Sequence, residues 1–348
     1  MDASVYRELP KVLLHDHLDG GVRAETLIEL AAEFGYKRLP TANAVRFSEW
    51  IAMRGRGSLE NLLWIIDHSV AVIQSSEALS RVANEAIIDL ASDGVVYAEP
   101  SFAPARFSQH GLSLEESVEA VLEGLKTGAE AAQIDANLIL TAVRDDPDSL
   151  RIARLASAYS DDGVVGIDLA GKEEGYPPSD HAIACRHARE HGVHVTVHAG
   201  EDTATLLYIR SALEDCHAER LGVAYMLTDD IDVSDDGSVV LGALAAHIRD
   251  EQIPLEMCPI TGAFLHDISA EDHPLGLFHR AGLAVTVNTD DRLISGSTMT
   301  KEFENAVMNH NMTLDDLSVM TLRATDAAFC DAETKKGVRA KVVEGFAV

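Results

Sequence analysis

Short β-rich apolar runs alternate along this chain with longer amphipathic stretches, and this alternation restricts the possible fold more than any other feature. The runs that predict strands are residues 12–18, 95–102, 137–143, 164–170, 194–199, 220–225, 254–257 and 284–289. Residues 79–91, 114–133 and 180–191 have the composition of amphipathic helices. Strands that alternate with helices form βαβ units around a parallel sheet. Eight such units in 348 residues predict an α/β fold, a (β/α)8 TIM barrel.

The spacing between the first two predicted strands is unusually long, at about 75 residues. Residues 47–73 within it predict additional helices after strand one, placed where they can cover the C-terminal face of the barrel. The Asp-rich segment 229–237 predicts a surface loop. No repeat, Pro-rich linker or low-complexity tract divides the chain, so we expect one domain over residues 1–348.

The charge balance excludes several classes of partner. Lys and Arg total 28 and Asp and Glu total 57, which gives a formal net charge of −29. Such an acidic surface repels nucleic acid and anionic membranes and favours solubility. No apolar stretch approaches the roughly 18 residues of a membrane-spanning helix. The expected partner is a small molecule, and the sequence leaves the oligomeric state open.

The cysteines and the first residues predict a cytoplasmic protein. None of the four cysteines forms a close Cys-x-x-Cys pair, which favours reduced thiols in a chain of this length; they are Cys185, Cys216, Cys258 and Cys330. The first residues lack a basic stretch followed by an apolar one, so no secretory signal is predicted.

Metal-binding residue types follow three of the predicted strands. His15 and His17 stand at i and i+2, which places both imidazoles on one face of a strand. His198 ends the fifth strand, and the segment Asn-Thr-Asp-Asp at 288–291 ends the eighth. Active sites of (β/α)8 barrels lie at the C-terminal ends of their strands. Three imidazoles and a carboxylate there bind Zn²⁺ and leave a position for water.

A further acid, Glu201, lies three residues after His198 and suits an acid or base beside the metal rather than a ligand. Other histidines have a simpler interpretation. We expect His194, His247 and His279 to be ordinary polar histidines outside the site, since a lone histidine is usually a hydrogen-bonded structural residue.

Five segments together carry a resemblance to a known family. They are 10–23 (PKVLLHDHLDGGVR), 164–171 (VVGIDLAG), 197–201 (VHAGE), 255–259 (LEMCP) and 285–291 (VTVNTDD). In these segments the chain resembles adenosine deaminase and its relatives in the metal-dependent amidohydrolase superfamily. The resemblance implies an enzyme of purine metabolism. The implied reaction is hydrolytic deamination of an aminopurine nucleoside or related aminopurine, in which a metal hydroxide adds to the amine-bearing ring carbon and ammonia leaves.

The resemblance also implies roles for individual residues. Glu201 would protonate the purine ring nitrogen, and Asp291 would orient the hydroxide and carry its proton. The backbone amide of Gly171 would meet the purine, and Asp19 would contact the ribose. One Zn²⁺ per chain, or another divalent metal, would have four protein ligands: His15, His17, His198 and Asp290.

One departure from the family pattern falls at the site itself. Val223 stands where the family has the histidine of Gly-His-Gly after strand six. Valine cannot hydrogen-bond a metal-bound water, and loss of one such group typically costs about 10²–10³ in rate. Tyr225, two residues later, is a possible replacement group, and His266 is a weaker candidate.

Three interpretations therefore remain. The protein is a deaminase with an altered substrate, a zinc enzyme of the same fold with another hydrolysis or elimination, or an impaired homologue that only binds ligand. Further departures lie at Pro100, which follows Glu99 where the family has Glu-Val-Arg, and at Asp145, where it often has histidine after arginine. Ile260 replaces a polar residue, which predicts a less polar lining near the pocket.

Overall fold

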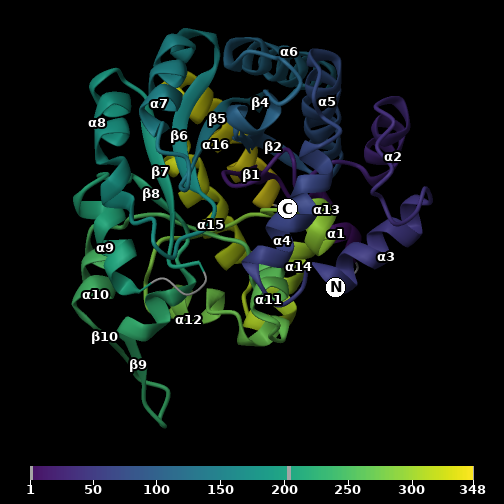
Figure 1. Cartoon of the computed structure of the whole chain (residues 1–348). Coiled ribbons are helices and arrows are strands. Elements are labelled where there is room, and N and C mark those ends of the chain that lie inside the picture. Colours follow the sequence, from purple (N-terminus) through teal and green to yellow (C-terminus); the bar gives the residue numbers. More distant parts are fainter. Residues whose placement is uncertain (1–2, 202–204, 348) are drawn as a thin grey trace.

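Parallel strands run from β1 near the N-terminus to β12 near the C-terminus and close into a barrel (Figure 1). The computed structural model describes residues 3–201 and 205–347. The barrel strands are β1 (Lys11–Leu13), β2 (Val95–Ala98), β3 (Ser101–Phe102), β4 (Asp135–Ala136), β5 (Leu138–Val143), β6 (Val164–Ala170), β7 (His194–Ala199), β8 (Arg220–Val223), β11 (Leu255–Met257) and β12 (Val285–Val287). Because β2 continues into β3 and β4 continues into β5, these ten segments make up the eight strands of the predicted (β/α)8 barrel.

The seam of the barrel brings the first and last barrel strands together. The hydrogen-bonded order is β1-β2-β4 in one sheet and β12-β11-β8-β7-β6-β5-β3 in the other. Isolated parallel bridges join Asp16 to Asp290 and His17 to Ser101. The His17 amide donates to the Asp290 carbonyl at 3.0 Å, and the Asp290 amide donates to the His15 carbonyl at 3.1 Å. Backbone pairing alone therefore places three predicted metal ligands side by side.

Helices surround the barrel (Figure 1). They are α1 (Ala3–Glu8), α2 (Ala24–Glu33), α3 (Ala44–Arg54), α4 (Leu59–Val70), α5 (Ser76–Ser92), α6 (Leu114–Ala132), α7 (Ser149–Ala158), α8 (Ala182–Glu190), α9 (Leu206–Glu214), α10 (Ala243–Asp250), α11 (Pro259–His266), α12 (Leu275–Arg280), α13 (Arg292–Ser295), α14 (Met299–His310), α15 (Leu314–Ala327) and α16 (Ala332–Phe346). The predicted helices at 79–91, 114–133 and 180–191 correspond to α5, α6 and α8. The extra helices predicted after strand one are α3 and α4, with α2 before them.

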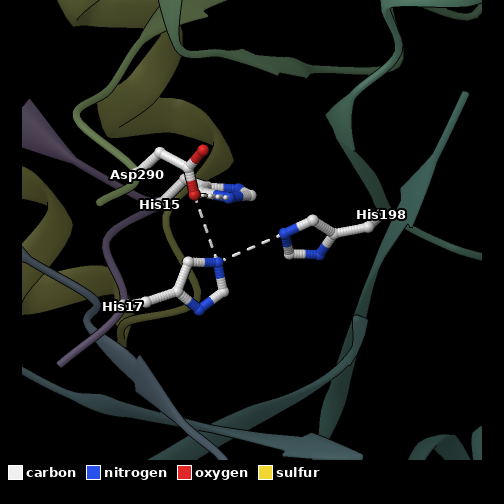
Figure 2. A group of neighbouring side chains, drawn as sticks. All are labelled: His15, His17, His198 and Asp290. Atoms are coloured by element: carbon white, nitrogen blue, oxygen red, sulfur yellow. Dashed lines mark hydrogen bonds and ion pairs between the residues drawn. The ribbon is translucent and has the colours of Figure 1, made fainter. Parts of the chain in front are cut away.

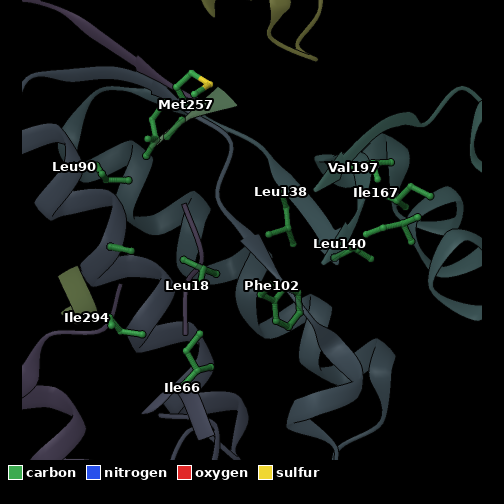
Figure 3. Close-up of a cluster of buried hydrophobic side chains, with 14 of the residues drawn as sticks. Leu18, Ile66, Leu90, Phe102, Leu138, Leu140, Ile167, Val197, Met257 and Ile294 are labelled. Carbon is green, nitrogen blue, oxygen red and sulfur yellow. The ribbon is translucent and has the colours of Figure 1, made fainter. Parts of the chain in front are cut away.

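Helix α6 shows how the sequence sets these elements. Ser113 caps its first turn, and Glu116 returns a hydrogen bond to the Ser113 amide, which satisfies two backbone donors at the helix start. Buried residues recur along one face, at Leu114, Val118 and Val121. That face packs closely against α5. Figure 3 shows another part of the same buried apolar core, where Leu90 of α5 and Ile66 of α4 lie among strand side chains such as Leu138.

Polar groups fill the inside of the barrel. Arg220 is buried between two carboxylates, with Nη1 2.7 Å from Glu99 Oε2 and Nε 2.5 Å from Glu256 Oε1. On β7 the apolar Val197 belongs to the core between barrel and helices, whereas Thr196 contacts Glu256. The period of two in a strand therefore separates an apolar outer face from a polar interior that reaches the metal ligands.

Several predicted segments differ from the structure. The strand predicted at 12–18 ends at Leu13 as β1, and after it Asp16 and His17 form only isolated bridges. The strand predicted at 220–225 ends at Val223, because Val223 and Ala224 adopt φ of 66° and 51° and turn the chain away. The run at 95–102 is broken before Ser101, since Pro100 lacks an amide for the ladder. The loop predicted at 229–237 contains β9 (Ile231–Val233), which pairs antiparallel with β10 (Val239–Leu241). Among the described residues, no helix is long and apolar enough to cross a membrane.

Candidate metal centre

Three imidazoles and one carboxylate converge at the C-terminal end of the barrel (Figure 2). His15 and His17 follow β1, His198 lies on β7, and Asp290 follows β12. One ligand atom from each lies within 4.8 Å of every other. Nε2 of His17 is 3.3 Å from Nε2 of His198 and 3.3 Å from Oδ1 of Asp290. Nε2 of His15 is 3.4 Å from the same Oδ1.

For two of the histidines, a carboxylate bound to Nδ1 fixes the ring orientation and the tautomer. Nδ1 of His15 lies 2.9 Å from Glu256, and Nδ1 of His198 lies 2.9 Å from Asp168. A carboxylate only accepts, so each Nδ1 carries the proton and each Nε2 presents its lone pair to the centre. Nδ1 of His17 lies 3.0 Å from Ser101 Oγ, which leaves its Nε2 facing the same point.

This donor set fits a divalent metal. Nε2 of His15 is buried and makes no hydrogen bond within the described part of the chain, and Nε2 of His17 faces Nε2 of His198. Two ring nitrogens that face each other at that distance need a proton or a metal ion between them. Three nitrogens and one carboxylate oxygen form the ligand set that zinc prefers at catalytic sites. The four residues are therefore suited to hold zinc or a similar ion.

Electrostatics at the centre favour positive charge. Burial lowers the pKa of His17, but the hydrogen bond and charge of Asp290 and the charge of Asp291 outweigh it, so the pKa is raised to about 10. Burial raises the pKa of Asp290, yet contacts with His15 and His17 leave it well below its ordinary value. The site thus stabilises added positive charge, whether protons or a divalent cation.

Asp291 lies beside the four predicted ligands, His15, His17, His198 and Asp290, which we call the metal group. A close approach to Gly20 holds it there. A Cβ at Gly20 would lie 1.5 Å from Oδ1 of Asp291, so only glycine leaves room for this carboxylate. Asp291 is buried, and its Oδ1 has no hydrogen-bond partner among the residues that the structure describes. Burial and the negative charge of Asp290 raise the pKa of Asp291 well above its ordinary value. This position gives the site a carboxyl group able to hold a proton.

A cavity of about 470 Å³ opens onto the metal group. Asp19, Gly171, Glu201 and Asp291 all line it, as do three of the four ligands. One wall is apolar and is formed by α4, one of the additional helices after strand one. Four of its side chains line the cavity: Leu59, Leu62, Leu63 and Ile66. An apolar wall opposite convergent polar groups is typical of a site for a small organic molecule.

The structure places the proposed replacement groups elsewhere. Val223 is buried, and its left-handed backbone breaks the strand alternation that would have put Tyr225 on the same face. The Tyr225 ring stacks on His266, with centroids 3.8 Å apart. Neither ring is among the residues that line the cavity. In this structure Tyr225 packs against His266, and its role as a replacement group stays a prediction.

The other departures have mixed outcomes. Asp145 lines the cavity, whereas Ile260 is not among the lining residues and its amide donates to Glu302, so the expected loss of polar lining stays a prediction. Pro100 interrupts the strand but leaves Ser101 in contact with His17.

Outside the metal group, the three histidines interpreted as structural have ordinary positions. His194 pairs with Glu219, His279 pairs with Asp316, and His247 is exposed on α10.

Sequence reasoning missed the residues behind the ligands. Asp168 and Glu256 each orient a ligand histidine from the middle of a strand. Glu173 accepts hydrogen bonds from the amides of Gly200 and Glu201. The signal for Asp168 and Glu256 was a single acid in an otherwise apolar strand, since a buried carboxylate needs a partner.

Comparison with known proteins agrees with this geometry. The family model described as adenosine deaminase matches residues 10–345. "Adenosine deaminase 1" of Streptomyces coelicolor is 47% identical over 333 residues, which cover 93% of this chain and 83% of that protein.

Solved structures share the whole fold. An amidohydrolase from Burkholderia ambifaria with bound Zn superposes with a TM-score of 0.87 at 26% identity, covering 99% of this chain and 92% of that one. The N6-mAMP deaminase of Arabidopsis gives a TM-score of 0.84 at 25% identity, covering 98% and 99%. Because the family model matches residues 10–345 and four metal-binding side chains converge at the barrel end, this chain belongs to the adenosine deaminase family of the amidohydrolase superfamily.

Proposed function

We propose that this protein is a zinc-dependent hydrolytic deaminase of an aminopurine nucleoside or related aminopurine. The observation that carries the proposal is the metal group at the floor of the cavity, with Glu201 and Asp291 lining the same space. Family membership supports the reaction class, and the solved relative with bound Zn supports the metal. One Zn²⁺ per chain would be held by His15, His17, His198 and Asp290.

Zinc bound there would lower the pKa of a water toward neutrality and so supply a nucleophile. Around it, Asp291 accepts a proton from the attacking water and turns the remaining oxygen toward the substrate. Its burial beside Asp290 suits this role, because a carboxylate whose pKa is raised is a stronger base toward the water. One proton of the water then completes the leaving ammonia, and the other replaces the proton that Glu201 gives to the ring nitrogen.

Glu201 is proposed to donate a proton to the ring nitrogen beside the reacting carbon. It is buried in the cavity, and its backbone amide is held by Glu173. The backbone amide of Gly171, whose φ is 96°, is proposed to hydrogen-bond the purine, and Asp19 the ribose. Positioning of this kind removes much of the entropic barrier to reaction.

Val223 makes a second candidate function specific to this chain. Without an imidazole from the end of β8, the site lacks one donor toward the attacking water. As the second candidate, we propose that the protein is a zinc enzyme of the same fold that catalyses another hydrolysis or an elimination. A relative of matching fold acts on N6-mAMP by its name, so substrates with a substituted amine belong in the test.

The deciding experiment is an ammonia-release screen on zinc-loaded protein. Aminopurines, their nucleosides and N6-methylated nucleosides and nucleotides are each supplied, and product is identified by mass. Release of ammonia or methylamine with formation of the oxo-purine supports the proposal. Metal-loaded protein with no turnover on any of them favours the second function, and calorimetric binding without turnover favours an impaired homologue.

The cellular location is also proposed. Cytoplasmic action is supported by the cysteines, all four of which are free thiols in the structure.

A further inference from the structure

Two buried charged residues lie behind the site without lining its cavity. Arg144 follows β5 and Glu173 follows β6, and both side chains are fully shielded from solvent. Arg144 Nη2 lies 3.5 Å from Glu173 Oε1. A buried ion pair is weak evidence of stabilisation by itself, because desolvation offsets the attraction. What the two side chains bind is more informative than their charge.

Glu173 holds the turn that follows β7. Its Oε1 accepts from the Gly200 amide at 2.9 Å, and its Oε2 accepts from the Glu201 amide at 2.8 Å. Gly200 has a φ of 79°, so the chain turns sharply at this point. Both oxygens of one carboxylate are therefore used on two consecutive amides, and the second belongs to the proposed proton donor.

Arg144 holds the other side of the same segment. Its guanidinium donates to the backbone carbonyl of His198 and, at 2.9 Å, to that of Tyr176. Its own amide donates to the Ala170 carbonyl at 3.0 Å. The rigid fork of arginine suits two carbonyls and a carboxylate at once. The pair thus connects the C-terminal ends of β5, β6 and β7.

We propose that Arg144 and Glu173 are positioning residues that clamp the main chain from His198 to Glu201. The clamp fixes the distance between a metal ligand and the proton donor, although neither residue touches substrate. This inference rests on the proposed function for the role of Glu201. A displacement of about 1 Å in a reacting group can cost about 10²-fold in rate, so such a clamp matters more for turnover than for folding.

The test compares Glu173→Gln with Glu174→Gln in the zinc-loaded protein. Glutamine at 173 offers one oxygen, and its NH₂ would face an amide donor, so one of the two hydrogen bonds is lost. Glu174 is the exposed neighbour and lines no part of the cavity, which makes it a matched control. For Glu173→Gln we expect kcat to fall by about 10–100-fold while KM changes less than about threefold. Glu174→Gln should match the wild type.

Hydrogen exchange supplies a readout that needs no activity. The amides of Gly200 and Glu201 should exchange at least about tenfold faster in Glu173→Gln, with bound zinc unchanged at one per chain. An Arg144→Lys variant keeps the charge but loses the fork, and should show the same pattern even if the glutamine variant folds poorly.

The outcomes separate the two proposals. Normal kcat in Glu173→Gln, or unchanged exchange at both amides, overturns the clamp while leaving the deaminase proposal intact. A kcat loss matched by lost zinc or a collapsed melting temperature also overturns it. A wild-type protein that releases no ammonia defeats the proposed function, and the exchange experiment then still decides the clamp.

Discussion

Nε2 of His17 and Nε2 of His198 lie 3.3 Å apart, although 181 residues separate them in the chain. His17 arrives there through backbone pairing with Asp290, and His198 through the parallel pairing of β7 with β8. Each ring also has a partner behind it, Ser101 for His17 and Asp168 for His198. Because these ligands come from distant strands of the barrel, metal affinity should depend on the integrity of the whole fold.

Metal removal should abolish turnover and lower stability together. Chelated protein loses the ion that joins four ligands from three parts of the barrel. Free metal at 1,000 times its dissociation constant contributes about 4 kcal/mol to the free energy of unfolding. Metal analysis should find about one zinc per chain, and zinc should restore both activity and melting temperature. Full activity in metal-free protein would contradict the assignment.

Asp168→Ala should weaken metal binding without unfolding the barrel. His198 then loses the carboxylate that fixes its tautomer, a change that typically costs 10–100-fold in metal affinity. Competition with a chromophoric chelator measures the affinity. Glu219→Ala is the control, because it removes a histidine–carboxylate pair of similar length on an exposed histidine, His194. Equal zinc affinity in the two variants would rule out the orienting role.

Val223→His should raise adenosine turnover, by about 10²-fold if the imidazole is the only missing group. It should not destabilise the fold, because histidine tolerates the left-handed backbone better than β-branched valine. Ala224→Gly, also at a positive φ, relaxes the backbone without adding a donor. Activity assays and thermal melts separate the two effects. No gain for the histidine variant would mean that other cavity residues, such as Asp145, also redirect the site.

Arg220→Met should be among the most destabilising single changes. It leaves Glu99 and Glu256 buried without their cation, and breaking a buried pair in this way costs about 3–5 kcal/mol. Arg210→Met is the control, because its pair with Glu214 is exposed and contributes about 0–1 kcal/mol. Urea unfolding at neutral pH measures both variants. Similar midpoints would show that the interior charges are not coupled.

Glu302 should make stability fall as pH rises. Burial raises its pKa to about 8 in the folded protein, although Ser297 and the Ile260 amide partly offset this. The folded state therefore holds a proton between roughly pH 4.5 and 8 that the unfolded chain has released. That favourable term is complete below this window and is lost as pH rises through it.

Glu302→Gln should consequently gain on the wild type between pH 5 and pH 9, by up to roughly 4 kcal/mol in the free energy of unfolding. Denaturant titrations at the two pH values measure the difference. A constant gap between variant and wild type would mean that the carboxyl group titrates normally.

Much of the fold was predictable from local pattern. The strands expected at 164–170 and 194–199 match β6 and β7 at both ends, because each apolar run is bounded by glycine or by a helix end. The helices expected after strand one are present. The prediction of one domain over residues 1–348 stays a prediction. The end of the strand expected at 220–225 was predicted wrongly. Valine and alanine rarely adopt a positive φ, so the sequence does not indicate that Val223 and Ala224 both do so.

The sequence by itself determined which chemistry the strand ends carry. His15, His17, His198 and Asp290 each follow an apolar run, and in a parallel barrel all such ends face one side. Only the tertiary structure decided which side chains orient these ligands and the segment around them. Asp168, Glu256 and the Arg144–Glu173 pair act through contacts between strands and loops distant in sequence. Local periodicity cannot encode such contacts, since they depend on which buried carboxylate meets which donor once the barrel has closed.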